Sequence, residues 1–422
     1  MHMKHLRTFF TVILLLFITF AVYAQTPSIA TTGVMLGEIQ IEGLKRTKFS
    51  VVRALIPLDE GQTIFQEDIE NVETVLLKSG LFSTVSLSLT PQTQDSTSIP
   101  VSDLVVTVEE KWSLIPVPYF TSDGESFNGG LFLIEANLFG YNTFLMTAVY
   151  GGTNGLRGLL VYSNPSIARS AWSHTLTGGF GTSDSAVYLP DTTLVRAFTS
   201  RYLNIGAGIG YSFTPQLDMS ANATFRDWKI QEIEIGVDSV PLTDLTYIEP
   251  EISLRYDDTR LADVLTVGTT ASLSSRFLLL ESGWEVSGDL SWSLPMWETQ
   301  RLKFMLSGGY GEMPALAETD IDGKDGYRTL PKSSSADRWA SITTGYDLPI
   351  FRTSWGVGII GHFWEFGMYD TDVIAEPQIF GGPGAGFRLY LRKVAIPAVG
   401  VDIAYNMFDP SWIFSVSVGV QM

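Results

Sequence analysis

The last segment of the sequence is Trp412-Ile413-Phe414-Ser415-Val416-Ser417-Val418-Gly419-Val420-Gln421-Met422, and from Phe414 onward it alternates between apolar side chains and small or polar ones. Strict alternation over this length predicts a β-strand with one apolar face. In water that face would need a second sheet packed against it, whereas in a bilayer the lipid itself satisfies it. The fold therefore depends on whether the pattern recurs upstream of Trp412.

Strand-length segments of the same texture recur throughout residues 112–422. Aromatic residues make up 12% of the chain, glycine contributes 39 residues, and no apolar run near the ~18 residues of a spanning helix follows Ala24. Because only a closed barrel leaves no unpaired backbone in lipid, we predict a mainly β fold, a transmembrane antiparallel β-barrel of about sixteen strands. A soluble β-sandwich is the alternative. The clearest further segments are Phe144–Gly151, Thr175–Gly181, Ile205–Phe213, Met219–Trp228, Thr266–Leu273, Val286–Leu294 and Leu302–Tyr310.

Residues 34–111 predict a small α+β domain ahead of the barrel. Leu36–Glu42 alternates as a strand, and Ser50–Ile56 and Phe65–Ser79 place apolar residues at helical spacing. Two further strands of period two follow, around Val85–Leu89 and Leu104–Val108. We expect Gly43 to form the turn after the first strand and Gly80 to end the second helix in the left-handed conformation that glycine favours.

The first residues predict a secretory signal peptide over residues 1–24. Lys4 and Arg7 precede an apolar stretch, Phe9–Val22, and Ala24 provides the small residue that signal peptidase requires. Since no cysteine is available for lipid attachment, we expect an exported protein that begins near Gln25 and is not a lipoprotein. Residues 25–33 would then form a short N-terminal segment. The alternative is a non-cleaved anchor helix, for which the apolar run is short.

Composition argues against nucleic-acid binding and against catalysis. Without Lys4 and Arg7 the 27 basic residues fall to 25 against 45 acidic ones, a net charge of −20, which disfavours nucleic acid as a partner. Cysteine is absent, and no nucleophile elbow, phosphate loop or zinc-protease motif occurs. His174 and His362 lie far apart in the sequence, and the pair Asp257-Asp258 fits a solvated turn. We therefore expect no cofactor, no metal and no enzymatic activity.

The α+β region resembles a single POTRA domain. The resemblance rests on the order strand, helix, helix, strand, strand, with Ile41-Glu42-Gly43-Leu44 closing the first strand and Gly80-Leu81-Phe82 leading into the second. It implies a domain that receives unfolded polypeptides by adding them to an exposed strand edge. A structural plug or spacer is the alternative for this region.

The barrel resembles the bacterial outer-membrane assembly insertases of the BamA and TamA kind. The loop between the eleventh and twelfth predicted strands, Glu312 to about Ala336, contains Asp325-Gly326-Tyr327-Arg328-Thr329-Leu330-Pro331. Phe363-Trp364-Glu365-Phe366-Gly367 resembles the family's acidic strand, and Gly384-Ala385-Gly386-Phe387-Arg388 with Val401-Asp402-Ile403-Ala404-Tyr405 resembles its closing hairpin. The resemblance implies a loop that folds into the lumen and sets its tip against acidic residues.

That implied contact gives a candidate lumen latch. The family arginine precedes the glycine of the loop tip, but here Asp325 occupies that place, and the nearest guanidinium is that of Arg328. We expect Arg328, beside Gly326 and Tyr327, to pair with Asp347 or Glu365 inside the barrel. The alternative is a solvated loop cation.

The first and last strands give a candidate lateral seam. Pro116 and Pro118 lack the N–H that a ladder requires, so the strand around Leu114–Thr121 cannot pair fully with a neighbour. We expect it to meet the closing strand with Phe120 opposite Ser417, near Gly419. Alternatively, both prolines belong to a linker and the strand begins at Tyr119.

These features together imply a bacterial outer-membrane protein, with its POTRA domain in the periplasm, that inserts or assembles client β-barrels. Its partners would be unfolded outer-membrane or secreted polypeptides, the lipid bilayer, and periplasmic chaperones or accessory lipoproteins. Two alternatives are a polypeptide translocation pore of the two-partner-secretion type and a passive surface adhesin or porin.

Overall fold

The computed structural model describes residues 33–92, 101–122, 127–153, 155–166, 170–189, 191–236, 242–262, 264–321, 327–330, 334–370, 377–391 and 397–418. The predicted signal peptide and the segment 25–32 lie outside these residues, as do Gly326 and Gly419 of the candidate sites.

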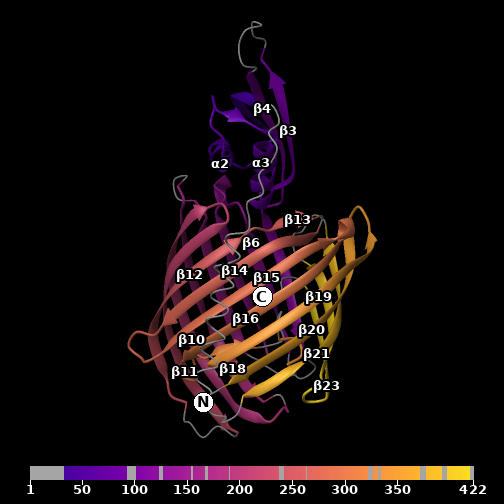
Figure 1. The fold of residues 1–422 in the computed structure, drawn as a ribbon. Coiled ribbons are helices and arrows are strands. Elements are labelled where there is room, and N and C mark those ends of the chain that lie inside the picture. Colours follow the sequence, from indigo (N-terminus) through magenta and orange to yellow (C-terminus); the bar gives the residue numbers. More distant parts are fainter. Residues whose placement is uncertain are drawn as a thin grey trace, which may run out of the picture. The chain divides into compact units, whose positions relative to one another are not determined.

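The N-terminal region forms a four-stranded sheet with the order β2-β1-β4-β3 and two helices. Its elements are β1 (Val34–Glu42), α2 (Phe49–Leu55), β2 (Thr63–Ile64), α3 (Gln66–Lys78), β3 (Phe82–Pro91) and β4 (Val101–Glu110) (Figure 1). The predicted order of two helices and three strands is present. The two-residue strand β2 is additional, because two residues are too few to show a period of two.

Apolar periodicity explains the core of this region. Val72 and Leu76, one turn apart on α3, are fully buried, and so are Leu104 and Val106 of β4. Gly43 and Gly80 have φ values of 90° and 74°, in the left-handed region expected of them. At Gly43 a Cβ atom would also lie 2.1 Å from the carbonyl oxygen of Val108, so the turn leaves no room for a side chain.

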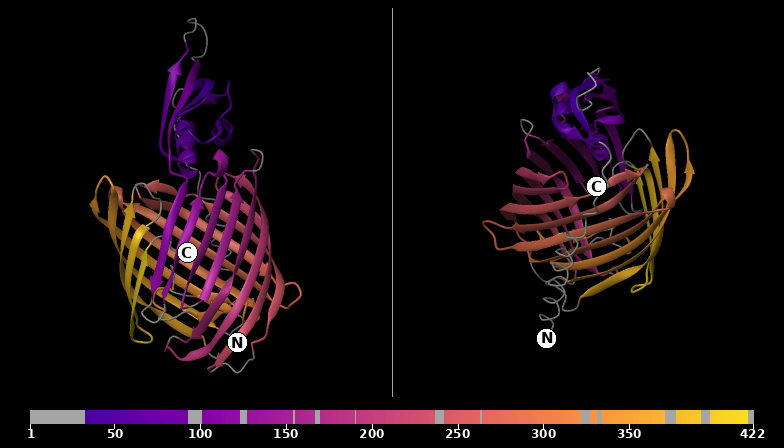
Figure 2. Two further views of the ribbon diagram at one scale, coloured as in Figure 1. Left: turned by 180° about the vertical axis from the view of Figure 1, so that it is seen from behind. Right: turned by 45° about the horizontal axis from the view of Figure 1, so that its top comes forward.

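The remaining strands close into an antiparallel barrel (Figures 1 and 2). Among the described residues the ring contains seventeen strand segments. Two of them, β12 and β13, both pair with β14 and follow each other along the same wall. Seventeen segments less this one interruption give sixteen wall strands, the predicted number. The segments are β5 (Leu114–Ser122), β6 (Phe127–Glu135), β7 (Phe144–Gly152), β8 (Gly155–Asn164), β9 (Trp172–Tyr188), β10 (Leu194–Thr214), β11 (Leu217–Ile235), β12 (Leu245–Asp257), β13 (Arg260–Ala262), β14 (Leu265–Phe277), β15 (Trp284–Met296), β16 (Gln300–Glu312), β19 (Arg338–Arg352), β20 (Gly356–Asp370), β21 (Gln378–Leu391), β22 (Pro397–Asn406) and β23 (Ser411–Val418).

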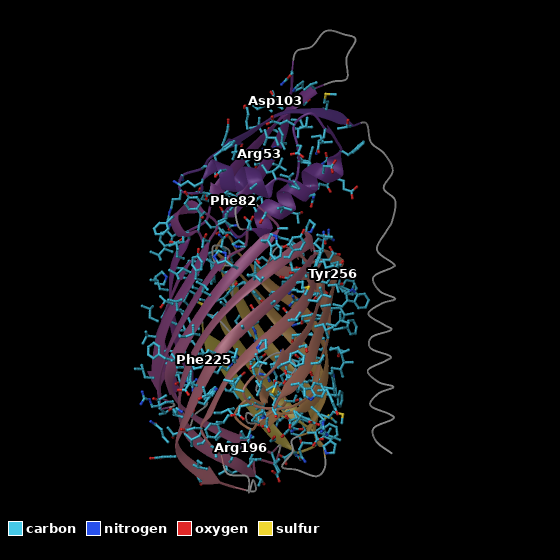
Figure 3. The ribbon with its side chains drawn as sticks, turned by 90° about the vertical axis from the view of Figure 1, so that its left-hand side faces the viewer. Arg53, Phe82, Asp103, Arg196, Phe225 and Tyr256 are labelled. Atoms are coloured by element: carbon cyan, nitrogen blue, oxygen red, sulfur yellow. The ribbon has the colours of Figure 1, made fainter. Side chains whose placement is uncertain are left out.

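Strand β10 shows why the wall suits a bilayer. Its outward side chains are exposed and apolar, whereas small or polar residues alternate with them on the inner face. The outward set is Leu203, Ile205, Ile209, Tyr211 and Phe213. Figure 3 labels Phe225 on the neighbouring wall strand β11, Tyr256 near one end of the barrel and Arg196 near the other. No helix in the described ranges is both long and apolar enough to cross a membrane.

A long connection joins β16 to β19, the eleventh and twelfth wall strands, as predicted. It contains a small two-stranded sheet formed by β17 (Thr319–Ile321) and β18 (Ser334–Ala336). Ile321, Leu330 and Ala336 of this connection are buried in one apolar cluster with wall residues Trp339, Tyr369 and Phe380, against which Tyr327 packs. We call the described residues of this connection, 313–321, 327–330 and 334–337, the lumen loop.

The strand β5 begins at Leu114 and includes both prolines. All nine of its residues have Cα partners on β6, including Pro116 with Leu133 and Pro118 with Leu131. The alternative in which the prolines belong to a linker is therefore wrong. On its other side, a single pair among the described residues, Phe120 with Val418, joins β5 to β23.

Candidate functional site

The site is organised by a carboxylate that the wall directs inward. Along β20 the outward residues Trp364 and Phe366 are exposed, so Glu365 between them faces the lumen. Its side chain is 0% exposed. A carboxylate so deeply buried requires hydrogen-bond donors or a cation close by.

Glu365 receives those donors from the lumen loop. Its Oε1 accepts hydrogen bonds from the backbone N–H of Thr329 (2.8 Å) and from the Thr329 hydroxyl (2.6 Å). Its Oε2 accepts a third from the backbone N–H of Arg328 (3.1 Å). We call these three residues the tip latch. Its contacts involve mainly the loop backbone, so they depend on loop conformation more than on side-chain identity.

The Arg328 guanidinium extends towards the closing hairpin. Its Cζ lies 3.5 Å from the centroid of the Phe363 ring, and its Nη1 lies 3.8 Å from Oδ1 of Asp402 on β22. Arg388 of β21 binds the other oxygen of Asp402 at 2.6 Å. Gly384 makes the stacking geometry accessible, because a Cβ atom there would lie 2.1 Å from the Phe363 ring. Arg328 thus meets a ring and a carboxylate supplied by two different wall strands.

The predicted latch residues are only partly brought together. Tyr327 packs in the apolar cluster of the lumen loop, and its hydroxyl lies 3.2 Å from that of Ser307. Asp347 has a different partner from the one expected, since it pairs with Arg301 of the adjacent strand β16, whose Nε lies 2.8 Å from it. The two residues are opposed in the ladder, so Arg301 reaches Asp347 without any contribution from the loop. The ring stacked on Arg328 belongs to Phe363 instead of Tyr327.

Both regions of the chain are similar to known proteins. Residues 34–111 match the POTRA family model, described as a surface antigen variable number repeat. Over 92% of the chain the fold is similar to "BamA from Haemophilus ducreyi lacking POTRA domains 1-3", with a TM-score of 0.57, 13% identity and 84% of that chain covered. The chain is a POTRA-containing protein with a BamA-like barrel. This confirms the family resemblance at the level of fold.

Two further solved structures share the fold of this BamA-like barrel. CdiB from Escherichia coli matches with a TM-score of 0.64, 13% identity, and coverage of 92% of this chain and 76% of the other. CdiB from Acinetobacter baumannii matches with a TM-score of 0.62, 12% identity, and coverage of 92% and 74%. No curated protein sequence matches the chain.

Sequence reasoning missed a second group of charges in the BamA-like barrel. Arg196 on β10 and Arg276 on β14 face the lumen, where both contact the first part of the lumen loop. Glu249, Glu285 and the loop residue Glu318 are all buried beside them. The only signal in the sequence was the presence of charged residues at inward positions of the wall strands. No group of three or more His, Cys, Asp or Glu residues suited to a metal occurs within the described ranges.

One carboxylate organises the turn that follows β1. Glu110, at the end of β4, accepts hydrogen bonds from the backbone N–H groups of Lys45 (3.2 Å), Arg46 (3.0 Å) and Thr47 (2.8 Å). Partial burial acts to raise the pKa of Glu110, but these hydrogen bonds outweigh burial and hold the pKa below its usual range. Glu110 therefore fixes the segment that follows Gly43.

Proposed function

We propose that this protein resides in the bacterial outer membrane, with residues 34–111 as a periplasmic POTRA domain and residues 112–422 as a barrel that assembles client β-barrels. The seam carries the proposal. The strands β23 and β5 meet where the ring closes, with Phe120 opposite Val418 as the described pair, and β5 contains two prolines. A client strand could complete that edge.

The chemistry of β5 supports a weak seam. Successive residues of a strand direct their N–H groups to opposite neighbours, so Pro116 and Pro118, two residues apart, remove donors from the same edge. Because β5 keeps an unbroken register with β6, we assign the missing donors to the edge that faces β23. Each absent ladder bond forgoes about 0.5–1.5 kcal/mol.

An edge exposed to lipid also supplies the driving force. Backbone groups without partners are costly in a bilayer, and pairing with an incoming strand removes that cost. The POTRA domain would deliver the client by strand addition at its sheet edge. Neither step requires a cofactor or a catalytic residue, so we propose a non-enzymatic mechanism.

A disulfide across the seam tests this function. The register places Phe120 opposite Val418, so the variant Phe120→Cys/Val418→Cys is the appropriate pair. Ser417, the residue expected opposite Phe120, is one residue out of this register. The chain has no native cysteine, which keeps the test free of competing thiols.

The expected result is that the oxidised pair folds normally but loses client insertion, and that a reductant restores it. The matched control is Leu131→Cys/Val149→Cys, which locks a ladder between β6 and β7 and should leave insertion intact. If the oxidised variant inserted clients as fast as its dithiol form, lateral opening would be excluded. If a locked chain instead still passes a polypeptide to the cell surface, the translocation-pore alternative is favoured.

A further inference from the structure

The first part of the lumen loop is held by two arginines of the barrel wall, separately from the tip latch. Nη2 of Arg196 lies 2.7 Å from the Glu318 carboxylate, and it also donates to the carbonyl of Ala315 and to the Ser335 hydroxyl, both at 3.3 Å. Ser335 in turn donates to Glu318. The side chains of Arg196 and Glu318 are only 4% and 3% exposed, so the pair is almost completely desolvated.

Arg276 makes a second set of contacts. It binds Glu285 with two parallel hydrogen bonds of 2.9 and 2.7 Å, a geometry that fixes the guanidinium plane. The same guanidinium donates to the carbonyl of Ala317 (3.0 Å) and to the Thr319 hydroxyl (2.8 Å). Thr319 then donates to Glu285 at 2.6 Å. We call Arg196, Arg276, Glu285, Glu318 and Thr319 the base clamp.

The base clamp and the tip latch are attached to different sides of the ring. Arg196 lies on β10 and Arg276 on β14, the sixth and ninth wall strands, whereas Glu365 and Asp402 lie on β20 and β22, the thirteenth and fifteenth. The sixth and fifteenth of sixteen strands are nearly opposite in a closed ring. The described parts of the lumen loop are therefore held at two different sides of the ring.

A barrel of this size is wide enough to leave an open lumen. Barrels of about 16 strands enclose an aqueous channel unless something fills it. The first part of the loop also places Met313 and Ala317 in a buried apolar cluster with wall residues Leu245, Tyr247 and Leu278. Charge pairing and apolar packing thus fix the same short segment against the wall.

We propose that the base clamp is a second, independent anchor that keeps the lumen loop across the barrel and seals the lumen to ions and small solutes. Arg196 and Glu318 are its positioning residues. The clamp holds the loop in the resting protein, when no client is bound, so its effect can be measured without a client. A buried ion pair that loses one partner leaves the other charge desolvated, which favours withdrawal of the loop segment into water.

The experiment uses the purified full-length protein in planar bilayers, with two readouts. The first is ion conductance. The second is the rate at which a maleimide labels the thiol of an Ala317→Cys variant, since Ala317 is buried beneath the clamp and no other cysteine exists. Heat-modified migration in gels verifies that each barrel is folded.

Arg196→Glu should increase conductance and raise the labelling rate on the order of tenfold or more. The reason is that removing one partner of a buried ion pair destabilises the closed position of the loop by more free energy than a tenfold change in its equilibrium requires. Arg196→Glu/Glu318→Arg should restore both readouts towards those of the native chain. The control is Arg255→Glu, which breaks an exposed pair with Asp257 on the wall strand β12 and should change neither readout.

Where Arg196→Glu fails to fold, Glu318→Gln provides the same measurement from the loop side and leaves the wall unchanged. Native conductance and labelling in a folded Arg196→Glu or Glu318→Gln variant would overturn the proposal. A charge-swapped double variant that remains as leaky as Arg196→Glu would also overturn it, because the ion pair would then not be the contact that holds the loop.

Discussion

Glu365→Gln is the substitution that examines the tip latch most directly. The native carboxylate is fully buried and accepts three hydrogen bonds, from the backbone N–H groups of Arg328 and Thr329 and from the Thr329 hydroxyl. Glutamine has nearly the same shape but offers one oxygen and one NH₂ group. If the oxygen remains with Thr329, the NH₂ group faces the N–H of Arg328, and two donors oppose each other.

The magnitude follows from the number of bonds lost. Glu365→Gln loses one charge-assisted hydrogen bond, worth about 1.5–3 kcal/mol. Glu365→Ala loses all three and leaves two buried N–H groups without an acceptor, at about 1–3 kcal/mol each. Since about 1.4 kcal/mol corresponds to a tenfold change in equilibrium, the released loop population should rise by roughly 10- to 100-fold in the glutamine variant and further in the alanine variant.

Limited trypsin digestion measures this population, because the Arg328–Thr329 bond can be cleaved only when the tip leaves Glu365. The cleavage rate at this bond, followed by mass spectrometry, should rank the native chain below Glu365→Gln and Glu365→Gln below Glu365→Ala. Glu251→Gln, on the lumen-facing side of β12, is the matched control and should digest as the native chain does. Equal cleavage in all four proteins would refute the assignment of Glu365 as the loop acceptor.

Two further predictions concern the POTRA domain. Residues 25–111 expressed alone should be soluble and unfold cooperatively in urea, because this range contains its own buried core; a broad, non-cooperative transition would contradict the predicted boundary near Trp112. The pKa of Glu110 is lower in the folded state than its ordinary value of 4.5, so the ionised carboxylate stabilises the domain above pH 4.5, and this stability is lost as the pH falls through the folded pKa. Glu110→Gln should therefore lower the free energy of unfolding at neutral pH and flatten its acid dependence, and an unchanged acid profile in this variant would exclude the role of Glu110.

The sequence contained enough information for the architecture because each prediction depended on local periodicity. On β10 the residues Leu203, Ile205 and Ile209 repeat every second position, and the structure exposes these side chains on the outer wall. Counting such segments also placed the lumen loop correctly between the eleventh and twelfth strands. The short strand β2 was not predicted, because Thr63 and Ile64 are only two residues and show no alternation in the sequence.

The pairings inside the lumen could not be predicted in the same way. Parity along a strand indicates that Glu365, Asp402 and Asp347 face inward, but it does not indicate which of them lies near the loop tip. That choice depends on register and on how far the loop extends, which are properties of the closed ring. Arg301 lies opposite Asp347 in the ladder and provides its partner, so Arg328 is left to meet Asp402.

The contacts that stabilise the barrel lie on other strands than the seam at which we propose that it opens. Described contacts join the lumen loop to β10 and β14 at Arg196 and Arg276, and to β20 and β22 at Glu365 and Asp402. None of these described contacts involves β5 or β23, the strands at which we propose that the ring opens. This separation suits the proposed function, because a barrel can open at one seam without unfolding when the contacts that hold the ring together lie away from the strands that separate. Tightening the lumen contacts should then raise the stability of the barrel without closing its seam, whereas restoring donors on β5 should close the seam without altering the loop.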